Sequence, residues 1–286
     1  MKVSAGGRAG TGKRPGPGKR LGAALRVAPG TTVDLGAFDP DATHGHSKVE
    51  SERELAAGLE RLSSLQDRLW AEAKHAVLVV LQGIDAAGKD GTIRHVMGAF
   101  NPMGAQVTSF KVPTPIELAH DFLWRVHQRT PARGEVGVFN RSHYEEVLVV
   151  RVHDLVPKAV WSNCYEQINA FEQSLAESGT TILKFFLLID RDEQKRRFQA
   201  RLDDPTKRWK FRLGDLDERR LWDSYMAAYE EALTRCSTDW APWYIVPANH
   251  KWFRSLAVAE ILGDVLEGLG AEYPRGEDLP PDLTID

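Results

Sequence analysis

Residues 83–92 place glycines, aspartates and a lysine at a spacing that suits phosphate binding. The segment reads Gly-Ile-Asp-Ala-Ala-Gly-Lys-Asp-Gly-Thr and contains the G-x-x-x-x-G-K pattern of a phosphate-binding loop, or P-loop. Glycines let the backbone curl so that its N–H groups face phosphate oxygens, and the next helix points its positive end there. The alternative is a glycine turn with a surface lysine. The expected phosphate contacts are Gly83, Ala86, Ala87, Gly88, Lys89, Asp90, Gly91 and Thr92.

Two aspartates distinguish this loop from the common pattern. The Ser or Thr that usually follows the lysine and holds magnesium is replaced by Asp90, and Asp85 adds a carboxylate inside the loop. A carboxylate so close to phosphate would repel it unless a cation lies between them. We therefore expect Asp85 to contact magnesium, directly or through water. The alternative is that Asp85 caps the turn or the helix. Asp90 is either a second ligand or a helix-start residue that favours the helix dipole.

A second polar cluster follows the apolar run 136–139. The neighbouring strand of a P-loop enzyme usually ends in an acidic magnesium ligand, but this position holds Asn140. Glu145 and Glu146 lie close enough in sequence to compensate, and Arg141 offers a planar fork for phosphate. The alternative for the two glutamates is that they begin a helix and interact with its dipole.

A basic segment lies further along the chain. Residues 191–220 contain eleven Lys or Arg and seven acids. Arg197 and Arg201 are spaced i,i+4 and share a helix face, and Arg208 belongs to the most basic stretch. Next to a P-loop sheet, such a segment predicts a mobile lid whose arginines close on the phosphates and exclude water. The alternative is a solvated basic helix that pairs with its own acids.

The elements that must position these residues alternate between strand and helix. Continuous apolar runs predict strands at 75–82, 107–110, 136–139, 180–189 and 243–247. Helical patterns fall at 93–100, 115–128, 159–178, 192–202, 217–234 and 252–269, and an amphipathic helix at 47–74. Apolar strands that alternate with helices indicate a parallel sheet covered on both faces. We expect an α/β, P-loop kinase-like three-layer sandwich with about five parallel strands, helices on both faces and a helical lid.

Charge and composition predict how the chain is divided. The 286 residues are 42% hydrophobic and carry a net charge of −3. Residues 1–33 hold seven Lys or Arg and no acid, which leaves −3 − 7 = −10 for the rest. We expect residues 1–33 to be a disordered basic tail, 34–270 a single domain with its lid at about 190–216, and 271–286 an acidic tail.

The bulk properties also limit location and partners. No apolar run approaches the roughly 20 residues that span a membrane, and no apolar segment follows the basic start as in a secretory signal. Two cysteines do not indicate a disulfide framework, so we expect a cytoplasmic protein. An acidic body repels polyanions on average, so we expect no nucleic-acid partner and no membrane partner. A phosphate chain would need a local cationic track.

Three segments together resemble a known family. They are G-x-D-x-x-G-K-D-G-T at 83–92, F-N-R-S-H-Y-E-E-V-L-V-V-R-V at 139–152, and K-R-W-K-F at 207–211. Over about residues 35–270 the chain resembles the second family of polyphosphate kinases. Asn140 followed by paired acids is similar to the subgroup called class III, whose members phosphorylate nucleoside mono- and diphosphates; other members carry Asp at this position.

The resemblance implies roles for individual residues. It matches Asp85 to a magnesium-associated aspartate, Lys89 to a phosphate-binding lysine, and Asn140 and Arg141 to the end of the acidic-motif strand and its phosphate-contacting arginine. Glu145 and Glu146 match acids of the nucleotide or metal site. With the arginines of the lid, the candidate residues are then Asp85, Lys89, Asn140 and Arg141 for catalysis, Asp85, Glu145 and Glu146 for metal, and Glu145, Glu146, Arg197, Arg201 and Arg208 for nucleotide or phosphate.

The implied activity is a reversible, magnesium-dependent transfer of phosphate from inorganic polyphosphate to adenine or guanine nucleotides, from AMP through ADP to ATP. Mn²⁺ is expected to substitute for Mg²⁺, and the protein is expected to form a homodimer or homotetramer. Two other functions fit the same motifs. One is an ATP-dependent nucleotide or small-molecule kinase, and the other is a nucleotide- or polyanion-binding module without turnover, which Asn140 and the basic N-terminal segment suggest.

Overall fold

Five strands form one sheet in the computed structural model, which describes residues 17–277 and 284–285. The strands are β1 (Ala76–Gln82), β2 (Ala105–Ser109), β3 (Val136–Asn140), β4 (Thr180–Leu188) and β5 (Trp243–Pro247). Their order is β2-β3-β1-β4-β5, and all four neighbouring pairs are parallel. The predicted parallel sheet is confirmed, and the segments that follow β1, β3 and β4 all begin at its carboxyl edge.

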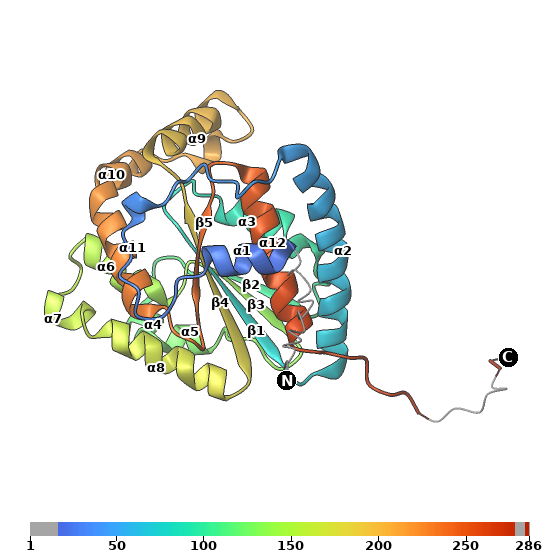
Figure 1. Ribbon diagram of the computed structural model, residues 1–286. Helices are drawn as coiled ribbons and strands as arrows, with labels where there is room; N and C mark the ends of the chain where they lie inside the picture. Colours follow the sequence, from blue (N-terminus) through green and yellow to red (C-terminus); the bar gives the residue numbers. More distant parts are fainter. Residues whose placement is uncertain (1–16, 278–283, 286) are drawn as a thin grey trace, which may run out of the picture.

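Helices cover both faces of the sheet (Figure 1). The strand β1 shows why: Val77, Val79 and Leu81 point into one core, and Leu78 and Val80 point into the other. One core is closed by α1 (Pro17–Leu25), α2 (Lys48–Glu72), α3 (Lys89–His95) and α12 (Lys251–Gly268), and the other by α5 (Trp124–His127), α6 (Val149–Val152), α7 (Lys158–Trp161), α8 (Cys164–Glu177) and α11 (Trp222–Cys236). The expected three-layer sandwich is confirmed.

Some predicted helices are divided. The pattern at 115–128 forms α4 (Pro115–Leu118) and α5, because the Asp121 carboxylate accepts hydrogen bonds from the Leu123 and Trp124 N–H groups and starts a new turn. The pattern at 217–234 is split between α10 (Gly214–Arg220) and α11. The remaining elements are α9 (Arg191–Asp203) and the 3₁₀ turns η1 (Leu35–Ala37), η2 (Met97–Ala99), η3 (His143–Val147) and η4 (Arg208–Lys210).

The predicted disorder of residues 1–33 is wrong for 17–33. Helix α1 buries Leu21 and Leu25 in the core shared with α12, and Val27 and Val33 are buried on the other side. The Val27 N–H donates to the Trp243 carbonyl at 2.8 Å and so covers the free edge of β5. These few apolar side chains order the segment despite its basic composition, because each one packs into a hydrophobic core. Residues 1–16 lie outside the described part of the chain.

The C-terminal prediction covers few described residues. Residues 271–277 have no regular secondary structure, although Ala271 is buried, and of the rest only 284–285 are described. Within the described ranges, no helix combines the length and the apolar character that crossing a membrane requires.

A buried ionic cluster joins η3 to α8 and β4. The Lys184 ammonium pairs with the Glu172 carboxylate and donates to the Tyr144 hydroxyl at 2.8 Å and the Cys236 carbonyl at 2.6 Å. His143 Nε2 lies 3.1 Å from Glu172 Oε1. All of these side chains are buried. The cluster therefore anchors the residues that follow β3 to the rest of the domain.

We expect Lys184→Met to lower the free energy of unfolding by about 3–5 kcal/mol, because it leaves the Glu172 carboxylate buried without a counter-charge. Urea unfolding followed by circular dichroism measures the change. The control is Lys74→Met at an exposed loop position, which should stay within about 0.5 kcal/mol of the wild type. Equal stability of the two variants would show that the ionic cluster does not stabilise the fold.

Candidate active site

The P-loop connects β1 to α3 in a conformation that needs glycine at its ends. Gly83 and Gly88 have φ values of 150° and 114°. A Cβ atom on Gly83 would lie 2.9 Å from the Leu187 carbonyl oxygen, so the loop packs directly on the backbone of β4. The strand–loop–helix order expected from the sequence is confirmed.

Lys89 is the first residue of α3, and its side chain folds back along the loop. Its ammonium donates to the Gly83 carbonyl at 2.5 Å, and the residue is only 9% exposed. Burial and the nearby Arg141 lower the pKa of Lys89 to about 8, against the opposing effect of acids that include Asp85. The ammonium is thus buried, charged at neutral pH and only partly compensated.

Arg141 brings the two motif segments together. One of its terminal nitrogens lies 3.0 Å from Asp85 Oδ1 and the other lies 3.4 Å from Glu145 Oε2. Burial opposes the charge of Arg141, but Glu145 and Asp85 outweigh it and hold its pKa above the usual value. The contact is possible because Leu81 and Asn140 are register partners, so β1 and β3 end level with each other. Gln82, the last residue of β1, donates to Glu145 Oε1 at 3.0 Å.

Asn140 and Asp90 are hydrogen-bond partners. The Asn140 amide donates to Asp90 Oδ1 at 2.8 Å and joins the end of β3 to the first turn of α3. An aspartate at position 140 would place two carboxylates at this distance and cost repulsion. The two departures from the common P-loop pattern are therefore in direct contact with each other.

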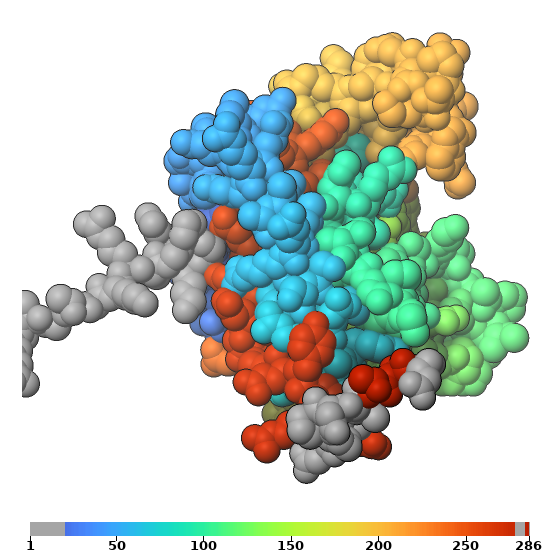
Figure 2. Space-filling view, turned by 90° about the vertical axis from the view of Figure 1, so that its right-hand side faces the viewer, coloured from blue at the N-terminus to red at the C-terminus, as the bar shows by residue number. Residues whose placement is uncertain are grey.

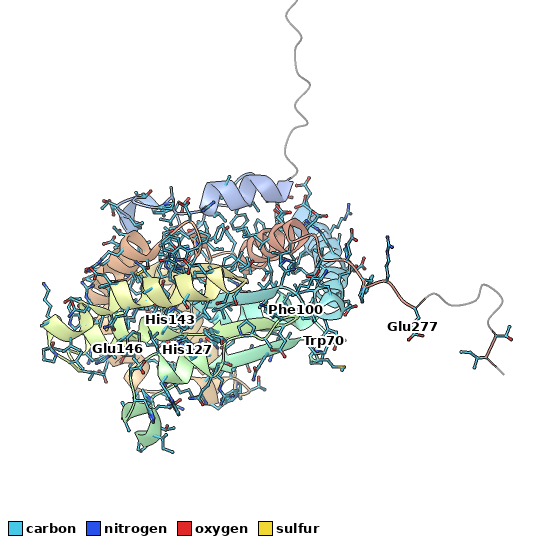
Figure 3. All side chains as sticks on the ribbon, turned by 90° about the horizontal axis from the view of Figure 1, so that it is seen from below. Trp70, Phe100, His127, His143, Glu146 and Glu277 are labelled. Atoms are coloured by element: carbon cyan, nitrogen blue, oxygen red, sulfur yellow. The ribbon has the colours of Figure 1, made fainter. Side chains whose placement is uncertain are left out.

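Glu146 does not join the other predicted metal ligands. Glu146 lies near the charged side chain of Arg125 and near the Cys164 thiol. Partial burial raises the pKa of the Glu146 carboxyl. In the view of Figure 3, the labels of Glu146, His127 and His143 lie close together. Only Glu145 of the pair contacts Arg141, and a role of Glu146 at the nucleotide or metal stays a prediction.

Arg197 is not available for phosphate as the lid prediction assumed. Its guanidinium donates to the carbonyl groups of Ala86 and Ala87, both at 2.8 Å, and to those of Ala248 at 2.6 Å and Asn249 at 3.1 Å. Its Nε also pairs with Glu193 at 2.6 Å. The i,i+4 spacing with Arg201 was correct, but only the fold could show that Arg197 points inward and clamps the loop from behind.

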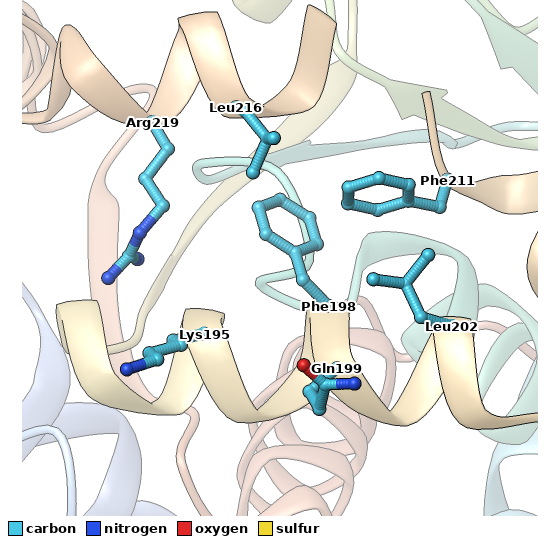
Figure 4. A pocket seen from close by; sticks show the side chains of 7 residues that line it. All are labelled: Lys195, Phe198, Gln199, Leu202, Phe211, Leu216 and Arg219. Carbon is cyan, nitrogen blue, oxygen red and sulfur yellow. The ribbon is translucent and has the colours of Figure 1, made fainter. Parts of the chain in front are cut away.

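The segment predicted to be a lid consists of α9, η4 and α10. Phe198 and Phe211 meet edge to face at 5.7 Å and, with Leu202 and Leu216, line a cavity of about 370 Å³ between the helices (Figure 4). Figure 2 shows this segment separated by an open gap from the segment around α4 and α5. Arg201 lies over the Phe198 ring, and Arg208 Nε donates to the Leu202 carbonyl at 2.6 Å. Both arginines therefore remain on the lid in this conformation.

Four positioning side chains escaped the sequence analysis. Gln194 Nε2 donates to the Asp85 carbonyl at 2.9 Å, and Arg219 donates to Gln194 Oε1 at 2.9 Å, which links the lid to the loop. Gln82, which donates to Glu145, and Arg254, whose guanidinium lies against Gly88 and Gly91, complete the set. Gln82 could have been found as the one polar residue at the end of an apolar strand, but the others carry no local signal.

Comparison with known proteins agrees with this geometry. Residues 45–272 match the family described as Polyphosphate kinase 2 (PPK2). The chain is 54% identical over 91% of its length to the AMP/ADP-polyphosphate phosphotransferase of Meiothermus ruber, of which 98% is covered. It is 47% identical over 88% of its length to the ADP-polyphosphate phosphotransferase of Rhodopseudomonas palustris, of which 91% is covered.

A solved structure agrees as well. The crystal structure of polyphosphate kinase 2 from Arthrobacter aurescens TC1 is 47% identical, superimposes with a TM-score of 0.87, and covers 90% of this chain and 92% of that chain. The chain belongs to the PPK2 family. The resemblance seen in the three sequence segments is thus confirmed.

The carboxylates of this PPK2 chain fit a magnesium ion that arrives with phosphate. In the described residues, no three His, Cys, Asp or Glu side chains gather closely enough to hold a metal by themselves. Asp85 and Glu145 instead converge on one guanidinium at the phosphate loop. Magnesium typically takes one or two carboxylates and completes its shell with water and phosphate oxygens.

We expect Arg197→Lys to lower the free energy of unfolding by about 1.5–3 kcal/mol, because one ammonium cannot serve four carbonyl groups from a fixed fork. Arg201→Lys is the matched control one turn further along α9, and its loss should stay below about 1 kcal/mol. Urea titrations of both variants provide the comparison. A loss that is the same in both would mean that Arg197 does not clamp the loop.

Proposed function

We propose that this chain is a polyphosphate kinase that transfers phosphate reversibly from inorganic polyphosphate to nucleoside mono- and diphosphates. The observation that carries the proposal is the convergence of Lys89, Asp85, Arg141 and Glu145 at the carboxyl edge of the sheet, next to a cationic lid. The similarity to relatives named as polyphosphate phosphotransferases supports polyphosphate as the donor.

The residues suggest how the transfer proceeds. An oxygen of the nucleotide's terminal phosphate attacks the end phosphorus of the chain, a new P–O bond forms, and the bond to the bridging oxygen breaks, so the chain loses one phosphate. The loop N–H groups and Lys89 hold the phosphates in line. Arg141, which pairs with Asp85 and Glu145 here, turns to the phosphate oxygens that gain charge. Arg201 and Arg208 close with the lid and keep water from the reacting phosphate.

We propose that Asp85 and Glu145 hold magnesium, with manganese able to replace it. When bound, the ion neutralises phosphate charge. The Arg141 guanidinium lies between the two carboxylates and holds them apart from each other. Adenine and guanine nucleotides as acceptors, a homodimer or homotetramer, and a cytoplasmic location stay predictions from the sequence.

Lys89→Ala tests the assignment directly. Purified protein, magnesium, AMP or ADP and polyphosphate of defined length are incubated, and the nucleotides are separated by chromatography. We expect transfer by the wild type and none by the variant, because the phosphates lose their buried counter-charge, while circular dichroism shows an intact fold. Wild-type rates in a folded variant would disprove the P-loop assignment, and transfer from ATP alone would indicate a conventional kinase.

The affinity for polyphosphate should fall as the pH rises above about 8. Lys89 is charged below its lowered pKa of about 8 and loses its proton above it. Phosphate chains bind the charged form, so the dissociation constant should increase by up to about tenfold per pH unit above this point. Fluorescence or calorimetric titrations with tripolyphosphate at pH 7–9.5 measure it. A flat profile would show that the Lys89 ammonium does not take part in binding.

Glu145→Gln and Glu146→Gln form a matched pair for acceptor choice. A monophosphate acceptor is one phosphate shorter than a diphosphate, so a carboxylate that holds magnesium is needed to fill the gap. We expect Glu145→Gln to reduce the rate with AMP by about tenfold or more and the rate with ADP by less. Glu146→Gln should change neither rate by more than about twofold, since it lies outside the site. Equal AMP rates in both variants would exclude an acceptor role for Glu145.

A further inference from the structure

Arg254 is buried against the last part of the P-loop and the start of α3. It belongs to the first turn of α12 and is only 3% exposed. A Cβ atom on Gly88 would lie 2.0 Å from one of its terminal nitrogens, and a Cβ on Gly91 would lie 3.1 Å from the other. The guanidinium thus rests against the backbone at the start of α3. It also explains Gly91, a glycine that the phosphate-binding pattern itself does not require.

This buried cation has little compensation within the described residues. Its Nε atom is buried without a hydrogen-bond partner, and its side chain makes one long hydrogen bond, 3.5 Å to the Ser255 hydroxyl. Burial and the neighbouring Arg197 lower the pKa of Arg254 to about 10, and no carboxylate acts against them. Lys251, on the same turn, adds another positive charge nearby. Arg197, in contrast, has Glu193.

A buried charge without a partner destabilises the free protein, and it is stabilised only when an opposite charge arrives. Arg254 is almost fully buried against the backbone of Gly88 and Gly91, which leaves its guanidinium little free surface for contact with a substrate. We propose that Arg254 is a positioning residue that holds a permanent positive charge behind the loop, and that the phosphate chain is its counter-ion. This inference rests on the proposed function, since it requires phosphate at the loop.

This proposed role predicts opposite effects of an uncharged replacement on the stability of the free protein and on its affinity for phosphate. Replacement by an uncharged side chain of similar size, Arg254→Met, should leave the free protein as stable as the wild type or more stable. The same variant should bind tripolyphosphate with magnesium about tenfold or more weakly, because a buried charge acts across a poorly screening medium. A side chain that only packs would give the reverse pattern, with lower stability and unchanged affinity.

The control is Arg61→Met. Arg61, on α2, pairs with Asp264 at 3.0 Å and Glu267 at 2.5 Å and thereby joins α2 to α12. Its loss should lower the stability of the free protein and leave tripolyphosphate affinity unchanged. Arg254→Lys keeps a positive charge and should recover part of the affinity that Arg254→Met loses.

The experiment measures the thermal midpoint without ligand and the dissociation constant for magnesium tripolyphosphate in all four proteins, at 50 and 300 mM salt as chosen conditions (about 14 and 6 Å of screening length). We expect the affinity ratio of wild type to Arg254→Met to change little with salt, because the charge is buried. Wild-type affinity in Arg254→Met, or in the equally uncharged Arg254→Gln if the methionine variant does not fold, would overturn the inference alone. A wild type that does not bind tripolyphosphate would overturn the proposed function with it.

Discussion

A loop that turns its N–H groups toward phosphate must turn its carbonyl groups away, and those carbonyls need donors behind the loop. Here the donors come from distant segments: Gln194 reaches the Asp85 carbonyl, and Arg197 reaches those of Ala86 and Ala87. Lys89 supplies one more, to Gly83. The shape of the phosphate site therefore depends on α9, which also belongs to the lid. A change in the position of the lid would act on the loop through the same hydrogen bonds.

The charges around the loop are arranged for an anion that is not part of the protein. Arg141 pairs with Asp85 and Glu145, while Lys89 lies buried among carbonyl groups and Arg254 lies behind the loop without a carboxylate. Bound phosphate would take over as partner of these cations, and the two carboxylates would then be free to hold a metal ion. On the proposed function, phosphate binding would stabilise the protein by supplying the counter-charge that Arg254 lacks and that Lys89 has only in part.

The second motif segment depends on a different interaction. Its polar residues face the loop, while His143 and Tyr144 are buried on the opposite side against Glu172 and Lys184. This buried cluster connects η3 to α8 and β4 and so holds the backbone next to Arg141 in place. Arg141 itself has a φ of 62°, which is unusual for an arginine. The sheet register then places it level with the loop.

The sequence by itself determined the sheet, the P-loop and the family. Buried parallel strands appear as continuous apolar runs, and a P-loop needs its glycines and lysine at fixed positions, so both leave local patterns. Tertiary structure alone decided which way individual side chains point. Glu145 and Glu146 are neighbours in sequence, yet only Glu145 reaches Arg141, and Arg197 and Arg201 share a helix face although only Arg197 reaches the loop.

The same reason accounts for the N-terminal segment and for Arg254. Residues 17–33 appear basic and irregular in sequence, but four of their apolar side chains are buried in hydrophobic cores formed mainly by the rest of the chain. Arg254 lies more than 160 residues from the loop it supports, in a helix whose pattern is simply apolar. Contacts between distant segments depend on the packing of whole helices against the sheet, and no local spacing of residue types records that packing.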